Sequence, residues 1–210
     1  MDTVLSKSLS ELIKERHSVR KYDPTYKISQ EEIKDILKEA TLAPSSSNLQ
    51  PWRFIVIQDQ ETKKELRTIA NNQEQVETAS AVIAVLGDKE MYKSVEKVYR
   101  SALEAGFMDE ANMERLIEST NKTYPFAPEE TRKNIAAFDA GLISMQIMLI
   151  AKDRGFDTVP MGGFNKEQFM EKFKVSDRYY PVVLIPIGKA AAPAFKTTRL
   201  PLEDALIDYR

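Results

Sequence analysis

The sequence contains no cysteine and a single histidine, His17. The absence of cysteine excludes disulfides, thiolate catalysis and cysteine-ligated metal or iron–sulfur sites. One histidine excludes a two-histidine metal site, and any Ser-His-Asp mechanism would have to run through His17. We therefore expect no bound metal and no catalytic residue in the protein itself. Any catalysis would then depend on a bound organic cofactor.

Long apolar runs and an excess of one charge are also missing. Lys and Arg total 30 against 32 Asp and Glu, so no global field favours nucleic acid or an anionic membrane. The most apolar stretches, at residues 81–86, 141–151 and 182–188, are shorter than a membrane span, and the first residues lack the apolar core of a signal peptide. We expect a cytoplasmic protein with no nucleic-acid or membrane partner. Its 210 residues, without repeats or linkers, predict one domain over residues 1–210.

Helical spacing and capping residues alternate with short apolar runs along the chain. The predicted helices cover residues 3–16, a segment capped by Ser29 and ended by Pro44, a segment from Asp59 to Ala70, one or two surface helices within 89–122, residues 131–154 closed by Gly155, and a short helix capped by Asn165. The predicted buried strands are residues 52–58, 81–86 and 180–187. This alternation predicts an α/β layered sandwich with helices on both faces of the sheet.

The segment 131–154 is the longest with an apolar helical period. Its apolar positions fall on one broad face, formed by Ile135, Phe138, Leu142, Met145, Met148 and Leu149. Two interpretations remain open: a buried core helix, or a helix that packs part of this face against a second subunit.

Two segments near the N-terminus suit an anionic ligand with several hydrogen-bonding groups. In Arg16-His17-Ser18-Val19-Arg20, two guanidinium forks that can bind phosphate bracket a hydroxyl. The alternative is a basic helix end that complements the helix dipole. The run Ser45-Ser46-Ser47-Asn48 places short donors and acceptors before Pro51-Trp52, which suits a sugar-like chain or the edge of a heterocycle. It could equally form an ordinary loop.

Two later segments extend this pattern. Val159-Pro160-Met161-Gly162-Gly163-Phe164 combines a proline with two glycines, which allows a backbone to approach a flat ligand and expose N–H donors. A tight turn explains the same residues. Lys196-Thr197-Thr198-Arg199-Leu200-Pro201 could supply cations to a phosphate, or it could be a solvated basic tail.

In this order the four segments resemble the FMN-dependent nitroreductase family, and the resemblance spans nearly the whole chain. The motifs are R-x-S-x-R, P-S-S-x-N-x-Q-P-W, Asn72 and Gln75 before AVIAVL, V-P-M-G-G-F, and a terminal T-x-R-x-P. The resemblance implies a nitroreductase-like fold with a central mixed sheet and a homodimer with flavin at its interface. It implies NAD(P)H-dependent reduction of nitroaromatics, quinones or similar flat electrophiles by ping-pong hydride transfer, with NADH or NADPH as the transient reductant.

The resemblance also implies a role for each motif residue. The FMN phosphate, ribityl chain and pyrimidine would be held by Arg16, His17, Ser18 and Arg20, with Lys196 and Arg199 completing the phosphate site. The partner subunit would contribute Ser45, Ser46 and Asn48, and the C-terminal tail, residues 189–210, would pack on that partner. The pyrimidine edge would meet Asn72 and Gln75, and the isoalloxazine would lie along Pro160, Met161, Gly162 and Gly163, with a glycine N–H directed at N5.

The chain departs from the family pattern at two positions. Many relatives carry an acidic residue where Gly162 stands, and a lysine where Gln75 stands. The second departure removes a cation from the edge at which reduced flavin becomes anionic, which leaves Arg20 as the charge partner.

Three other classes remain open on the sequence. A specialised member of the superfamily, such as a dehalogenase or an oxidase of a biosynthetic intermediate, would elaborate residues 89–128, where Tyr124 and Phe126 are candidates for a substrate pocket. Those aromatic residues could equally be helix core. A non-catalytic FMN carrier or sensor would bind flavin without turnover, and a structural domain would use the basic motifs only as solvated surface.

Overall fold

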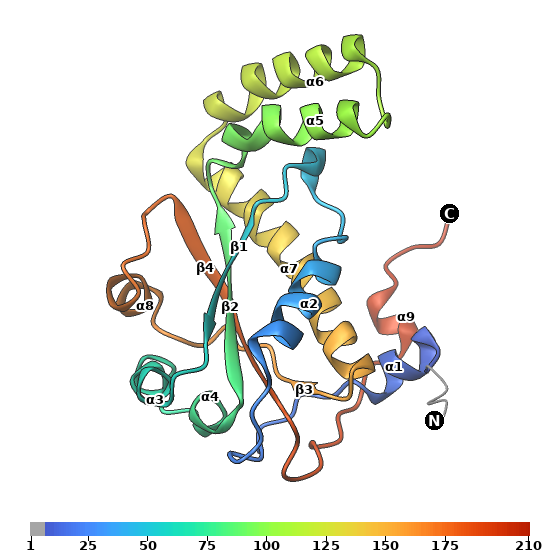
Figure 1. The fold of residues 1–210 in the computed structure, drawn as a ribbon. Helices are drawn as coiled ribbons and strands as arrows, with labels where there is room; N and C mark the ends of the chain where they lie inside the picture. Colours follow the sequence, from blue (N-terminus) through green and yellow to red (C-terminus); the bar gives the residue numbers. More distant parts are fainter. Residues whose placement is uncertain (1–6) are drawn as a thin grey trace.

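The structure is a computed structural model that describes residues 7–210. A four-stranded sheet flanked by helices forms the body of the molecule (Figure 1). The strands are β1 (Trp52–Ile57), β2 (Ala81–Asp88), β3 (Asp157–Thr158) and β4 (Tyr179–Gly188). The α-helices are α1 (Leu9–Glu15), α2 (Gln30–Ala40), α3 (Gln60–Ile69), α4 (Glu74–Thr78), α5 (Val95–Glu104), α6 (Glu110–Thr123), α7 (Glu129–Asp153), α8 (Lys166–Lys172) and α9 (Leu202–Ala205). Short 3-10 helices are η1 (Ser46–Asn48), η2 (Met91–Ser94) and η3 (Tyr124–Phe126).

The strand order is β1-β2-β4-β3, and each neighbouring pair is antiparallel. Every residue of β2 is buried, with one core cluster on each face of the sheet. A parallel bridge joins Ser18 to Thr158, and the Val19 N–H donates to the Thr158 carbonyl at 3.1 Å. The N-terminal segment is thus attached to the β3 edge, which makes the pairing mixed. The expected layered α/β fold is confirmed.

Strand β1 corrects one expectation. The sequence predicts a fully buried strand there, but only Trp52 and Ile57 are buried and Val56 is 38% exposed. The reason is position, because β1 is an edge strand that the helices cover incompletely. The sequence also misses α4 and β3, since both are too short to show a period.

The predicted helix caps are confirmed. Ser29 accepts from the Glu32 N–H at 3.0 Å, Asp59 from the Thr62 N–H at 2.8 Å, and Asn165 from the Gln168 N–H at 3.0 Å. Gly155 follows α7 with φ +75°, the left-handed conformation that glycine adopts readily. The N-terminal helix begins at Leu9 after a Ser8 cap, and the first part of the expected segment, residues 3–6, lies outside the described residues.

Helix α7 packs directly on the sheet. A Cβ added to Gly87 of β2 would lie 2.9 Å from the Cβ of Ala136, so small residues on both sides permit this close contact. By length and composition α7 could cross a membrane, but 44% of its apolar window is buried, and Ile143 and Ile147 lie fully inside the core. One side of α7 therefore belongs to the core, and the interpretation that another side packs against a second subunit stays open.

Only part of the predicted face of α7 is buried. The buried side consists of Ala136, Asp139, Ala140, Ile143, Ser144, Ile147, Met148 and Ala151. Phe138 is 65% exposed and Met145 is also at the surface. The buried face of α7 is thus shifted by about one residue from the predicted face. As a result, some apolar side chains of α7, such as Phe138, are left at the surface.

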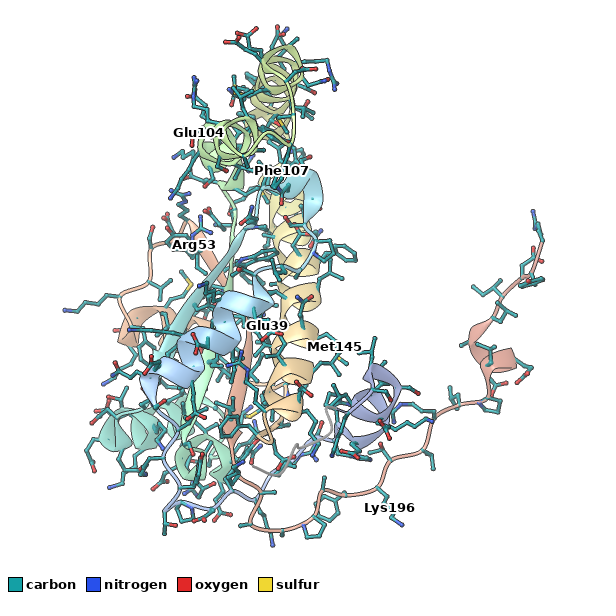
Figure 2. All side chains as sticks on the ribbon, turned by 45° about the vertical axis from the view of Figure 1, so that its right-hand side comes forward. Glu39, Arg53, Glu104, Phe107, Met145 and Lys196 are labelled. Atoms are coloured by element: carbon teal, nitrogen blue, oxygen red, sulfur yellow. The ribbon has the colours of Figure 1, made fainter. Side chains whose placement is uncertain are left out.

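Helices α5 and α6 form a hairpin that stands beyond one end of the sheet (Figure 1). A separate small core beneath it contains Leu49, Met91, Val95, Tyr99, Met113 and Ala136. Phe107, in the connection from α5 to α6 and labelled in Figure 2, is highly exposed. The prediction of surface helices in this region is confirmed.

Lys63 of α3 is buried, with 1% of its surface exposed, and its Nζ donates to the Ala79 carbonyl at the end of α4. Burial lowers the pKa of Lys63 to about 8, with a smaller contribution from the nearby charge of Lys27. The folded state therefore binds fewer protons than the unfolded state between pH 8 and the ordinary lysine pKa, and stability rises with pH across that window.

We predict that the free energy of unfolding rises by about 2 kcal/mol between pH 7.5 and 9.5 in the wild type, measured by urea denaturation, and that Lys63→Met loses this rise. Lys64→Met on the same helix is the control, because Lys64 is exposed and paired with Glu61. If Lys63→Met keeps the pH dependence, Lys63 titrates normally in the folded protein.

Candidate functional site

A basic cavity of about 530 Å³ lies beside α1. It is lined by Ile13, Lys14, Arg16, His17, Ser18, Met145, Thr197 and Arg199. Figure 2 shows Met145 on the side of α7 that is turned toward α1. No carboxylate among residues 7–210 forms an ion pair with Lys14, Arg16 or Arg199, so the cavity carries uncompensated positive charge.

Arg16 is the most informative group in this cavity. Its Nε is buried and has no hydrogen-bond partner within the described chain. A buried donor of this kind costs free energy unless something accepts from it. Nearby, His17 Nδ1 lies 2.9 Å from the Glu15 carbonyl, and Arg199 Nη1 donates to Thr197 Oγ1 at 2.9 Å. The cavity is therefore built to receive an anion with several acceptor oxygens.

A second cavity, of about 410 Å³, lies farther along the same N-terminal segment. It is lined by Arg20, Lys21, Glu74, Gln75, Ala192, Pro193, Ala194 and Phe195. Arg20 Nη1 lies 3.5 Å from the Ser18 carbonyl, which links the two cavities through one short segment. The parallel bridge of Ser18 to Thr158 fixes that segment on the edge of the sheet.

The predicted glycine segment is attached to the sheet next to this cavity. The Met161 N–H donates to the Leu184 carbonyl at 2.8 Å, and Leu184 returns the bond at 3.0 Å. Pro160, Gly162 and Gly163 are exposed, and a Cβ on Gly162 would meet nothing within 4 Å. Gln75 Nε2 lies 3.6 Å from Met161 Sδ, so the predicted pyrimidine-edge residue contacts the predicted isoalloxazine segment.

Sequence reasoning misses two side chains that support this region. Asn71 Nδ2 and Gln73 Nε2 both donate to the Gly163 carbonyl, at 3.0 and 3.1 Å. The predicted Asn72 stands between them and is exposed. The signal available in the sequence was the run Asn71-Asn72-Gln73, whose first two residues adopt φ of 55° and 56°, a conformation that asparagine tolerates.

The turn with Ser45, Ser46 and Asn48 lies elsewhere. Figure 1 places η1 beneath α5, well separated from α1. Its backbone is left-handed at Ser47 (φ 49°) and Asn48 (φ 50°), conformations that non-glycine residues adopt only where the surroundings hold them. Within one protomer, the structure therefore does not bring these residues to the other site residues.

Asp139 of α7 holds this turn in place. Its carboxylate accepts from the Ser46 N–H at 3.0 Å and from Ser46 Oγ at 3.2 Å. Burial raises the pKa of Asp139, and the two bonds from Ser46 oppose that rise. The sequence signal was an acidic residue on the buried side of the apolar helix, which the predicted face left out.

Two tyrosines tie the same turn to the α5–α6 hairpin. Tyr99 donates to the Ser47 carbonyl at 2.9 Å, and the Tyr124 hydroxyl lies 3.0 Å from Ser47 Oγ. Phe126 is 83% exposed, and neither Tyr124 nor Phe126 lines one of the two cavities. A substrate pocket at these two residues therefore stays a prediction.

The C-terminal tail contributes unequally to the basic cavity. Arg199 and Thr197 line it, whereas Lys196 does not. Figure 2 places Lys196 on the extended tail, away from the body of the molecule. Within residues 7–210, no group of three or more His, Asp or Glu side chains could hold a metal ion.

The family can now be stated from comparison with known proteins. Residues 13–189 match the model of the nitroreductase family. YdgI of Bacillus subtilis, which is named for an NAD(P)H nitroreductase activity, is 45% identical over 195 residues, covering 92% of this chain and 93% of the relative. This chain belongs to the nitroreductase family, as the motifs predict.

Solved structures agree. A protein from Exiguobacterium sibiricum, described as a nitroreductase in complex with FMN, matches with a TM-score of 0.92 and 45% identity, covering 97% of this chain and 98% of that one. An NAD(P)H:FMN oxidoreductase-like protein from Staphylococcus epidermidis matches with a TM-score of 0.94 and 37% identity over the full length of both chains. The predicted nitroreductase-like fold is confirmed.

We predict that Asp139→Ala lowers the free energy of unfolding by about 2 kcal/mol, because both Ser46 donors lose their buried acceptor. Urea denaturation measures the loss, and amide exchange should accelerate at Ser46. Asp153→Ala at the exposed end of α7 is the control and should stay close to wild type. Equal stability of the two variants would show that Asp139 does not hold the turn.

Proposed function

We propose that this protein is an FMN-dependent oxidoreductase that uses NAD(P)H to reduce flat electrophiles such as nitroaromatics or quinones. The observation that carries the proposal is the basic cavity in which a buried Arg16 Nε, beside Ser18 and Arg199, has no hydrogen-bond partner among residues 7–210. A phosphate monoester supplies the acceptor oxygens that this donor set requires.

The rest of the site also fits FMN. From the phosphate cavity, Ser18 leads to Arg20 and the second cavity, so a ligand with a phosphate at one end and a ring at the other would follow this segment. Gly162 and Gly163 expose backbone beside that cavity, which suits a flat ring. Arg16, Ser18 and Arg199 would hold the phosphate end, and Arg20, Gln75 and the two glycines would meet the ring.

When bound, FMN supplies two-electron chemistry, taking hydride from NAD(P)H and passing it to an acceptor in a ping-pong cycle. The protein supplies binding, orientation and charge. With Gln75 in place of a lysine, Arg20 is the cation beside the pyrimidine edge, where it would stabilise the negative charge of the reduced ring. We place this activity in the cytoplasm, where NAD(P)H is available.

The site requires a second copy of the chain. The Ser46–Asn48 turn lies far from α1 within one protomer (Figure 1), and the basic cavity is lined by Ile13 and Lys14 of α1. An apolar surface beside α1 and α7 is left uncovered, formed by Leu9, Ile13, Phe138 and Met145. The tail from residue 189 exposes further apolar side chains, namely Phe195, Leu200, Leu202, Leu206, Ile207 and Tyr209. We infer a homodimer in which the tail packs on the partner and the partner's turn completes the site.

A specialised acceptor is the second candidate. The CLA biosynthesis enone reductase from Lactiplantibacillus plantarum is 31% identical, over 93% of this chain and 92% of the relative. An activated carbon–carbon double bond is also a flat electrophile. Three alternatives remain: a dehalogenase, a biosynthetic oxidase, and a carrier that holds FMN without turnover. Assays with different electron acceptors distinguish each of them from a general nitroaromatic or quinone reductase.

We predict that the protein retains FMN after desalting and that its visible absorbance bleaches on anaerobic addition of NADPH or NADH. Arg16→Leu should weaken FMN binding at least tenfold but leave riboflavin binding nearly unchanged, because only FMN carries the phosphate. Lys38→Leu, an exposed cation on α2, is the control. Retained flavin that survives both reductants would identify a carrier, and no retained flavin would refute the proposal.

We predict that Phe138→Asp yields a monomer in sedimentation velocity and loses FMN affinity at least tenfold, because the partner's turn is lost. Phe107→Asp is the control, since Phe107 is also exposed (84%, against 65% for Phe138) but lies at the hairpin connection. A wild-type monomer that binds FMN tightly would contradict the dimeric site.

A further inference from the structure

One continuous chain of side-chain amides links the second cavity to the exposed glycines. Gln75 Nε2 donates to Gln73 Oε1 at 3.0 Å and contacts Met161 Sδ at 3.6 Å. Gln73 Nε2 in turn donates to the Gly163 carbonyl and to the Ala70 carbonyl, both at 3.1 Å. The two edges of the proposed ring site are therefore connected through Gln73.

These hydrogen bonds determine which atoms of Gln75, at the edge of the second cavity, remain free to bind a ligand. An amide has two N–H donors and one acceptor oxygen. Both donors of Gln75 are directed at Gln73 and Met161, and nothing in the described chain donates to its Oε1. Gln75 lines the cavity, so it presents an acceptor to whatever binds there.

The second edge presents the opposite polarity. The Gly163 carbonyl is occupied by Asn71 and Gln73, and the Gly162 carbonyl accepts from the Phe164 N–H at 3.2 Å. Within residues 7–210 nothing accepts from the N–H groups of Gly162 and Gly163. The Asn165 N–H donates to the Ile69 carbonyl at 2.9 Å, which anchors the far end of the segment. The glycine pair therefore presents donors from a fixed backbone.

These two polarities match the oxidised isoalloxazine ring. Its pyrimidine carries one N–H donor, at N3, and its central ring carries an unprotonated N5 that accepts. An acceptor at Gln75 suits N3–H, and donors at Gly162 and Gly163 suit N5. A neutral amide in place of the lysine of relatives thus changes the kind of contact at the pyrimidine edge from a charge to a specific hydrogen bond.

We propose that Gln73 is a positioning residue that orients both contacts at once, holding the Gln75 oxygen toward N3 and the glycine N–H groups toward N5. The proposal rests on FMN being the ligand, as argued above. It differs from a general structural role, because loss of Gln73 should remove the recognition of two particular ring atoms and not only the affinity for the whole cofactor.

The test compares binding of FMN, 5-deaza-FMN and 3-methyl-FMN by fluorescence titration of the apoprotein. The first analogue lacks the N5 acceptor and the second lacks the N3 donor. We expect the wild type to prefer FMN over each analogue by about three- to tenfold, the range of one neutral hydrogen bond. In Gln73→Met both preferences should fall toward one.

Gln73→Glu separates the two contacts and decides the question if the methionine variant does not fold. It retains an acceptor for Gln75 Nε2 but cannot donate to the Gly163 carbonyl. We expect it to lose the preference against 5-deaza-FMN and to keep the preference against 3-methyl-FMN. Gln60→Met is the control, since Gln60 donates to the Glu77 carbonyl of α4 from an exposed position outside the network.

The outcomes distinguish this inference from the proposed function. A wild type that binds FMN without preference over either analogue, or a Gln73→Glu variant that keeps both preferences, overturns the role of Gln73 while FMN binding stands. A wild type that does not bind FMN overturns the proposed function together with the inference.

Discussion

The close contact between α7 and β2 is the constraint on which the rest of the structure depends. Gly87 and Ala136 are small enough to let the helix lie directly on the sheet. This contact sets how closely α7 approaches the sheet, and so it also positions Asp139, about one turn further along the helix. The same helix then contributes Met145 to the basic cavity. One packing contact thus sets the positions of two separate parts of the site.

The two parts are stabilised by different physics. The Ser46–Asn48 turn is held in an unfavourable backbone conformation by a buried carboxylate and two tyrosine hydroxyls, so its geometry comes from tertiary contacts. The N-terminal basic segment is an extended strip added to the edge of the sheet, and its geometry comes from backbone pairing with Thr158. Each part is rigid for its own reason, and the dimer proposed above would bring them together.

Much of the fold could be predicted from the sequence where the cause is local. A cap such as Ser29 or Asn165 acts within three residues, so its pattern is visible in the chain. The structure places Arg16 and Ser18 around one cavity and Arg20 and Gln75 around the other, and their roles toward FMN stay predictions. The contacts of Asp139 and Gln73 could not be predicted, because each bonds to a residue about 90 positions away and only the packed fold supplies that partner. The edge position of β1 was missed for the same reason.

The amide network has a consequence for the conditions under which the ring edge can work. Asn71, Gln73, Gln75 and the glycine backbone contain no group that gains or loses a proton at ordinary pH. A lysine at position 75 would couple its contact to solution pH and to ionic strength, since a cation is screened by salt. With amides here, the hydrogen bonds among these residues stay the same in acidic and alkaline solution and respond little to salt. The protein thus leaves the electrostatic response of its site to the charged residues that line the two cavities, among them Arg16, Arg20 and Arg199.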